Sequence, residues 1–408
     1  MLADHPIFVV LIAAVLAPLV GQTSLGKRVP VVVFEVVLGV VIGPHALALV
    51  EYDRFLGIMH NVGMVAVLFM AGMEMDFAQI RGRPLRLALL GWLGTIAIGL
   101  LGIGVIDLVG GDVAPWMVVI ALATTGLGTL LPILRDGGQL GTPYGRMLLA
   151  AGTVGEVGPI VAASLVLSTR FSSWQEFALL LVFLALVGTA IAVGEGLRPP
   201  RVIALLARTM HQSTQLPVRI SLLLLGVLVF VCERMGFEAA FGAFAAGMIV
   251  GVAARGPDGQ EFRIKMDAVC FGWFAPFFFV GTGVAFDVAA LMRSGTTMLL
   301  LPVFFLLFLA ARGLPVFLYR RDLPPRDLVP FGLCSAVASL GIVVVVTTAG
   351  QKSGHMRPET ANALIGAALL SLLVYPTAAR ALLASAAGSA DVPDQRPSAA
   401  APGDSGTG

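Results

Sequence analysis

Charged residues are scarce in this chain of 408 residues. They make up 12% of it, whereas hydrophobic residues make up 58%, and the mean hydropathy is +0.94. So few charges cannot cover a soluble domain with this much apolar surface. The composition therefore predicts a polytopic membrane protein whose solvent is the lipid bilayer, and no nucleic-acid partner is expected.

Cysteine is also rare. Cys232, Cys270 and Cys334 lie singly in or beside apolar runs, with neither metal-type spacing nor a disulfide framework. Catalytic patterns such as His-Glu-x-x-His and Gly-x-Ser-x-Gly do not occur in the sequence. We therefore expect neither an enzyme nor a bound cofactor.

Long apolar runs dominate the rest of the chain. Windows of roughly 20 apolar residues, divided at Gly, Pro and charge clusters, predict an all-α protein with thirteen transmembrane helices. They are expected at approximately 6–26, 29–49, 57–77, 84–109, 114–134, 144–169, 175–197, 215–233, 236–254, 267–289, 296–319, 328–350 and 359–384. The first run lacks a preceding basic flank and is expected to be retained as a span.

The ends of the chain follow from composition and charge. Residues 386–408 are rich in Ala, Ser, Gly and Pro, so they are expected to form a disordered tail after a membrane domain at 1–385. Most Lys and Arg residues lie in the loops after odd-numbered spans. Because short basic loops stay in the cytoplasm, we expect a multi-pass cell-membrane protein with its N-terminus outside and its C-terminus in the cytoplasm.

Two charged residues fall inside predicted spans. Glu156 is the only charge between residues 150 and 167, and Arg312 is the only charge between residues 299 and 319. A charge at such depth costs about 2.5–3.5 kcal/mol on insertion scales, so it usually faces a cavity or an opposite charge. The two residues are therefore predicted to be partners. The alternatives are that Glu156 is a tolerated packing feature and that Arg312 snorkels to an interface.

The chain repeats itself at an interval of about 210 residues. Residues 38–43 resemble 246–251, and residues 69–76 resemble 279–287. An odd number of spans separates the copies, so the second half is predicted to enter the membrane inverted. Inverted repeats are typical of secondary transporters, in which the ion site lies at mid-depth between discontinuous helices.

Symmetry-related segments in the fifth and twelfth spans are predicted to be broken. The residues that mark them are Gly126, Gly128, Pro132, Ser335, Ser339 and Gly341. Pro132 leaves nearby carbonyls free, and an ion could bind them. Close helix packing explains either segment alone equally well, but the occurrence of both at related positions favours two broken helices that cross.

On these features the chain resembles the monovalent cation:proton antiporter superfamily. The resemblance covers essentially all spans and rests on 29–44, 69–76, the Thr-rich segment ending at 132, 241–247 and 274–283. It implies a homodimer in which each chain has a dimer-forming panel and a core of six helices with two crossed broken helices. The panel is expected at approximately 6–49 and 175–254, and the core at approximately 57–170 and 267–385.

The resemblance also assigns a site. The family carries an Asp-Asp or Asn-Asp pair in the sixth span, whose last carboxylate binds cation and proton in turn. Here the pair reads Gly155–Glu156, so only Glu156 can take that role. Arg312 matches the family's basic residue in the eleventh span and would compensate the charge. Further expected roles are cation binding by Thr124 and Thr125, weaker binding by Thr153, and either a cation funnel or a structural role for Glu35.

The expected mechanism is competition for one carboxylate. Burial favours its neutral form, whereas a bound cation favours its charged form. A single acid suggests electroneutral exchange of one proton for one monovalent cation, with Na⁺ expected and K⁺ or Li⁺ left open. Three alternatives remain: a K⁺/H⁺ exchanger of the Kef type, a bile-acid-type sodium symporter, and a non-transporting sensor or subunit built on an antiporter scaffold.

Overall fold

The computed structural model describes residues 6–23, 29–75, 80–108, 115–127, 141–167, 212–254, 259–287 and 295–388, with single positions between 130 and 139 and between 178 and 209. This part of the chain contains helices and no strand. Apart from single positions, the predicted span at 175–197 lies outside the described residues. So do Gly128, Pro132 and residues 389–408 of the tail predicted at 386–408. Residues 386–388, which were expected to be disordered, belong to the last described helix.

The helices confirm a multi-pass membrane protein. Seven of the described helices are long and apolar enough to cross a membrane, or up to eight if one bent pair counts as a single span. Three shorter apolar helices accompany them, at Pro6–Gly21, Val31–Ile42 and Ala239–Ala253. The count of thirteen spans stays a prediction.

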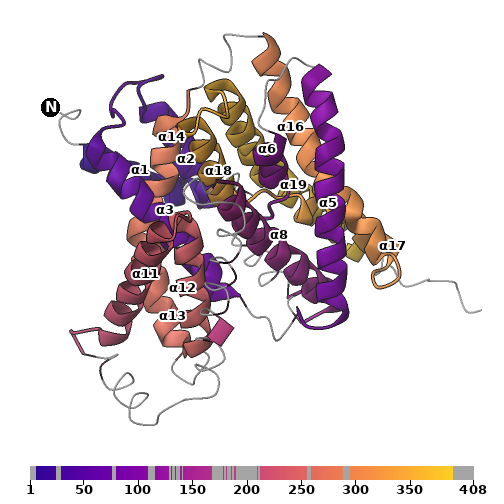
Figure 1. Ribbon diagram of the computed structural model, residues 1–408, viewed down its shortest axis with the longest axis horizontal. Coiled ribbons are helices and arrows are strands. Elements are labelled where there is room, and N and C mark those ends of the chain that lie inside the picture. Colours follow the sequence, from indigo (N-terminus) through magenta and orange to yellow (C-terminus); the bar gives the residue numbers. More distant parts are fainter. Residues whose placement is uncertain are drawn as a thin grey trace, which may run out of the picture.

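One group of helices packs around α3 and lies at the left of Figure 1. It comprises α1 (Pro6–Gly21), α2 (Val31–Ile42), α3 (Arg54–Glu74), α11 (Leu216–Arg234), α12 (Ala239–Ala253), α13 (Gly259–Val269), the π-helical η2 (Cys270–Phe274) and α14 (Ala275–Ala285). Within it, α3 packs mainly on α12, and α2 packs mainly on α14.

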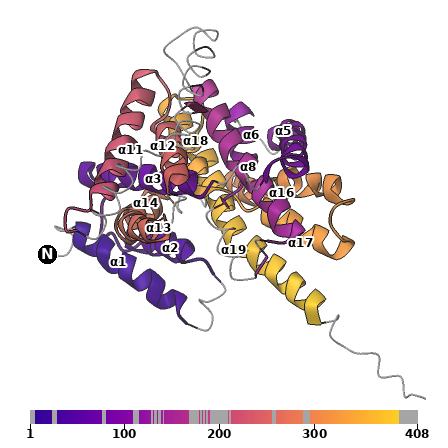
Figure 2. The ribbon, with the colours of Figure 1, turned by 90° about the horizontal axis from the view of Figure 1, so that it is seen from below.

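The second group packs around α8 and α19. It comprises α5 (Arg83–Leu108), α6 (Pro115–Leu122), α8 (Pro143–Leu167), α16 (Gly295–Gly313), the 3₁₀-helical η3 (Leu314–Tyr319), α17 (Pro325–Ser335), α18 (Leu340–Lys352) and α19 (Pro358–Gly388). Figure 2 shows the same division from below, with α1 and α2 on one side and α5, α16 and α17 on the other.

The division differs from the panel and core boundaries expected from the sequence. Residues 57–77 and 267–289 were expected in the core, yet α3 packs mainly on α12, and α14 packs mainly on α2 and also on α1. The physical reason is close backbone contact: α3 and α14 carry glycines that let α12 and α2 approach them more closely than any larger residue permits. The second packing group therefore begins at α5 in the first half of the chain and at α16 in the second half.

These glycine contacts confirm the internal repeat. A Cβ added to Gly39 in α2 would collide with the backbone of α14, and one added to Gly283 in α14 would collide with the backbone of α2. The same reciprocal contact joins Gly247 in α12 and Gly72 in α3. Since Gly39 corresponds to Gly247 and Gly72 to Gly283, at the interval of about 210 residues, one interlocked pair of helices occurs twice.

A cavity of about 2000 Å³ lies between the two groups. Side chains from α3, α6, α11, α14 and α18 line it, among them His60, Thr282 and Val345. Glu233 and Lys352 add charge to its wall. The cavity is thus bounded by both groups, where relative movement of the groups would change its shape.

Candidate functional site

Two interrupted helices meet inside the second group. The chain leaves the helical conformation after α6, through residues 123–126, and is helical again at Leu127. α17 and α18 are separated by 336–339 and bent by 40°. Gly126 N donates to Val337 O at 2.8 Å, and a Cβ on Gly126 would lie 2.8 Å from Ala338 O. The breaks therefore cross in direct contact, as the sequence predicted.

Two threonines hold the crossing together. Thr125 Oγ1 donates to Ser335 O at 2.7 Å. Thr124 Oγ1 donates to Ala121 O at 2.8 Å and accepts a hydrogen bond from Ser339 N at 3.3 Å. In this conformation both hydroxyls, which were expected to bind a cation, are engaged with backbone groups of the crossing.

Glu156 lies at the crossing, near the middle of α8, with 3% of its surface exposed. Its Oε2 accepts a hydrogen bond from Leu127 N at 2.8 Å, and its Oε1 accepts one from Ser339 Oγ at 3.0 Å. Leu127 begins the helical continuation after the first break, and Ser339 precedes α18. Free N–H groups and the helix dipole make helix N-termini favourable for negative charge. Both partners thus stabilise the carboxylate form of Glu156.

The first broken helix contacts α8 at Gly155. Pro159 has no N–H to donate to the carbonyl four residues earlier, which frees Gly155 O. Thr125 N donates to this oxygen at 2.8 Å. A Cβ on Gly155 would lie only 2.5 Å from Arg312 Nη2 and 2.6 Å from Thr125 Oγ1. A residue with a side chain would therefore displace one of them.

The roles of Gly155 and Pro159 were missed by the sequence reasoning. A proline inside a predicted span, four residues after a glycine, is the signal that could have found them. Gly155 was noted only as a missing second acid. In the structure, the space that its side chain would occupy holds the arginine instead.

Arg312 is 5% exposed, so it is buried and does not snorkel to an interface. Its Nε donates to Thr125 Oγ1 at 2.7 Å and, at 3.4 Å, to Ser335 O, while Nη2 donates to Ala151 O at 2.9 Å. No ion pair joins it to Glu156 in the described part of the chain. The direct pairing expected from the sequence is wrong in this conformation.

Helix ends explain why the two charges do not touch. α17 ends at Ser335, whose carbonyl belongs to the negative end of that helix, and the guanidinium of Arg312 lies against it. Glu156 accepts from Leu127 N, where the chain becomes helical again after the first break, and from the hydroxyl of Ser339, which directly precedes α18. Each charge is thus compensated by backbone dipoles and hydrogen bonds, with no need for an ion pair.

The remaining predicted residues are spread more widely. Thr153 is buried in α8, one turn before Glu156, and Gly341 lies in the first turn of α18. Ser335 contributes its carbonyl, whereas its hydroxyl has no partner within the described residues. Glu35 is buried in α2, which packs mainly on α14, and it is not part of the cavity wall. The structure therefore does not bring Glu35 to the crossing.

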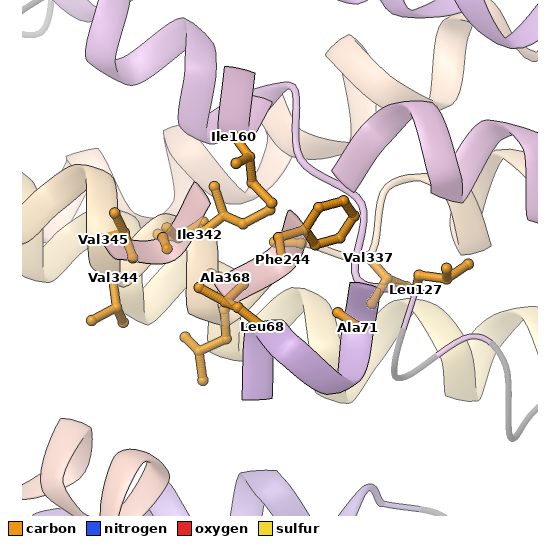
Figure 3. Packing of buried hydrophobic residues seen from close by; sticks show 14 of the residues in the cluster. Leu68, Ala71, Leu127, Ile160, Phe244, Val337, Ile342, Val344, Val345 and Ala368 are labelled. Carbon is orange, nitrogen blue, oxygen red and sulfur yellow. The ribbon is translucent and has the colours of Figure 1, made fainter. Parts of the chain in front are cut away.

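An apolar layer separates the crossing from the cavity. Ile160 follows Glu156 by one turn on α8, and Ile342 lies within one turn of Ser339 on α18. Figure 3 shows both side chains packed with Phe244 of α12 and Leu68 of α3. Val345, which lines the cavity, lies six residues beyond Ser339, or about 9 Å along a helix. The site is closed toward the cavity in this conformation.

Comparison with known proteins places the chain in a family. The model of the family described as "Sodium/hydrogen exchanger, transmembrane" matches residues 10–385, so the chain belongs to this family of membrane transporters, which are not enzymes. The fold resembles that of the sodium proton antiporter MjNhaP1 from Methanocaldococcus jannaschii. The TM-score is 0.62 at 19% identity, and the match covers 95% of this chain and 98% of that one.

Three curated relatives are similar in sequence. YjbQ of Bacillus subtilis is 24% identical over 384 residues, which cover 90% of this chain and 61% of YjbQ. The Na(+)/H(+)-K(+) antiporter GerN of Bacillus cereus is 24% identical over 375 residues, covering 88% of this chain and 91% of GerN. Cation/H(+) antiporter 15 of Arabidopsis thaliana is 25% identical, with coverage of 84% and 44%. The chain thus spans about half of the plant protein and about three-fifths of YjbQ.

Proposed function

We propose that the chain is a secondary antiporter that exchanges a monovalent cation for a proton, with Glu156 as the shared site. The single observation that carries the proposal is the position of this carboxylate. It lies at the crossing of two broken helices, buried, with one hydrogen-bond donor on each oxygen. Membership of the sodium/hydrogen exchanger family supports it.

The chemistry of a lone buried carboxylate accounts for the coupling. With a proton bound, Glu156 is neutral, and with a cation bound its charge is compensated. Without either, it is a buried anion whose passage across an apolar barrier is costly. Exchange therefore proceeds only between the two occupied forms.

A single acid supports electroneutral exchange. Arg312 keeps its charge in both occupied forms, and Gly155 offers no second carboxylate. One proton thus replaces one monovalent cation at Glu156. Thr124, Thr125 and freed backbone carbonyls at the crossing are the further oxygen ligands in this proposal, with Thr153 as a weaker one.

Access to the site would alternate by movement between the two helix groups. The group around α3 serves as the panel, and the group around α8 and α19 carries the site. The apolar layer of Ile160 and Ile342 closes the route to the cavity here and would part in the other conformation. A homodimer built on the panel and a cytoplasmic C-terminus complete the proposal.

Na⁺ is the first cation to test and K⁺ the second. The relative GerN is named for Na⁺, H⁺ and K⁺ together, so a K⁺/H⁺ exchanger is the second candidate. Both are hard monovalent ions that suit oxygen ligands, and the crossing supplies carboxylate, hydroxyl and carbonyl oxygens.

The decisive experiment uses the full chain in proteoliposomes. Luminal pH is recorded after addition of Na⁺, K⁺ or Li⁺, at several clamped membrane potentials, with Glu156→Gln as the control. We expect a pH change with at least one cation, no dependence on potential, and no exchange by the variant. Cation-coupled proton flux that survives in Glu156→Gln would refute the proposed site, and a voltage-dependent equilibrium would refute electroneutrality.

A further inference from the structure

Ser339 occupies the N-cap position of α18 without acting as a cap. Its backbone has φ −80° and ψ 99°, and its side chain makes no hydrogen bond to the first turn of the helix. Serine in this position ordinarily accepts a hydrogen bond from the second or third helical N–H. Asp53, for example, caps α3 by accepting from Leu56 N at 2.7 Å. The hydroxyl of Ser339 is directed elsewhere.

The backbone of Ser339 is fixed on both sides. Its N–H donates to Thr124 Oγ1 at 3.3 Å, and its carbonyl accepts from Val343 N at 3.0 Å. The residue is 6% exposed. With the backbone held in this way, the hydroxyl donates to Glu156 Oε1 at 3.0 Å. The side chain thus contacts the proposed cation and proton site directly, from the second broken helix.

We propose that Ser339 is a further residue of the cation site, which its hydroxyl both positions and completes. A hydroxyl has one donor and two acceptor lone pairs. Donation to Oε1 orients the charged carboxylate of Glu156 while no cation is bound. The lone pairs of the same oxygen then serve as a ligand for a monovalent cation beside Oε1. This inference rests on the proposed antiport at Glu156.

Ser339 thereby connects the occupant of Glu156 to α18. A protonated Glu156 no longer requires a donor at Oε1, so it loses this reason to hold the hydroxyl. A charged Glu156, with or without cation, retains it. The second broken helix therefore receives a different contact in the two occupied forms of the carrier.

Three substitutions separate this role from helix capping. Ser339→Ala removes the hydroxyl and the cap preference, Ser339→Gly removes the hydroxyl but keeps most of the cap preference, and Ser339→Thr keeps both. Loss of one hydrogen bond to a charged group corresponds to about tenfold in an equilibrium constant. We expect the KM for Na⁺ or Li⁺ to rise about tenfold in both Ser339→Ala and Ser339→Gly, while kcat stays within about twofold of the wild-type value. Ser339→Thr should have the wild-type KM.

Cation binding provides a second readout that does not depend on transport. The thermal stability of the full chain in detergent is measured against rising Na⁺ or Li⁺ concentration. Since stabilisation grows with the ratio of ligand concentration to Kd, Ala and Gly should need about tenfold more cation for the same shift. If Ser339→Ala does not fold, Ser339→Gly carries the test.

Ser371→Ala is the matched control, because Ser371 serves the same crossing without touching Glu156. Its Oγ accepts from Ala338 N at 3.0 Å. We expect its KM to be unchanged. The proposal is overturned if Ser339→Gly keeps the wild-type KM, or if Ser371→Ala raises KM as much as Ser339→Ala. Activity that survives in Glu156→Gln contradicts the proposed function itself, whereas an inactive Glu156→Gln beside an unaffected Ser339→Gly contradicts only this inference.

Discussion

The two broken helices are anchored in chemically different ways, although the repeat relates them. The first break is anchored on α8 through Gly155 O, which accepts from Thr125 N, and through Glu156. The second break is anchored on α19 through Ser371, whose hydroxyl accepts from Ala338 N and donates to Ala368 O at 2.7 Å.

The difference shows how two structurally related halves come to carry a single proton-binding group. Both anchors satisfy backbone N–H groups that a broken helix leaves free. Only the first does so with a group that can gain or lose a proton. Among the described residues, the one basic side chain at the crossing, Arg312, comes from the other half. The two repeats therefore have the same arrangement of helices, and they differ chemically because Glu156 comes from the first half and Arg312 from the second.

The largest expected effect tests the acidic anchor. Glu156→Gln keeps an oxygen to accept from Leu127 N but cannot exchange a proton, so we expect exchange to be abolished with folding intact. Transport in proteoliposomes and size-exclusion behaviour in detergent measure the two properties. Glu156→Asp is the companion variant: it keeps a titratable acid and should retain partial activity.

The next effect tests the basic residue. Arg312→Ala removes buried hydrogen bonds to Thr125 Oγ1 and Ala151 O. Hydrogen bonds to charged groups contribute about 1.5–3 kcal/mol each, so we expect the loss of these two bonds to destabilise the protein by about 3–6 kcal/mol. Thermal unfolding in detergent measures it. Arg312→Lys keeps the charge but cannot reproduce the planar guanidinium contacts, so its melting temperature should lie between those of the wild type and Arg312→Ala. An unchanged melting temperature in Arg312→Ala would remove its role at the crossing.

A smaller effect tests the absence of a side chain beside the acid. Gly155→Ala places a Cβ 2.5 Å from Arg312 Nη2, and overpacking of this kind costs about 1–3 kcal/mol. Gly226→Ala is the matched control, because a Cβ there meets nothing within 4 Å. We expect Gly155→Ala to lower the melting temperature and Gly226→Ala to leave it unchanged or raise it. Equal behaviour of the two variants would contradict the close approach of Arg312.

The smallest expected effect concerns the apolar layer. Ile342→Ala shortens a buried side chain that packs beside Ile160 and Phe244. We expect a weaker barrier between site and cavity, seen as a slow cation-independent proton leak in proteoliposomes. Leu223→Ala, on the exposed face of α11, is the control and should not leak. If proteoliposomes with Ile342→Ala show no proton leak, the barrier does not depend on Ile342.

Much of the site could be anticipated from composition and pattern. Glu156 and Arg312 stand out because few charges occur in long apolar runs, and the crossing follows from Gly, Thr and Ser at related positions. Their partners could not be anticipated. Which carbonyl Pro159 frees is a local matter, but that Thr125 N takes it depends on how α6 meets α8.

The packing of α3 and α14 was missed for a related reason. Hydropathy shows that both helices are apolar, but it does not show which neighbouring helix each of them packs against. The reciprocal contacts of Gly39 with α14 and of Gly72 with α12 determine these neighbours. A single sequence shows the glycines, but not which helix each of them contacts. The sequence therefore predicted that α3 and α14 are apolar helices, but not the neighbours on which the structure packs them.

The amino-acid sequence by itself determined that this chain enters a membrane, that it repeats, and that Glu156 and Arg312 lie in otherwise uncharged apolar runs. These properties depend on the transfer of side chains from water, which each residue brings with it. Only the tertiary structure decided that Arg312 lies against the end of α17 while Glu156 meets Leu127 and Ser339. Helix ends attract opposite charges only where folding brings them, and that depends on distance and orientation between segments far apart in the chain.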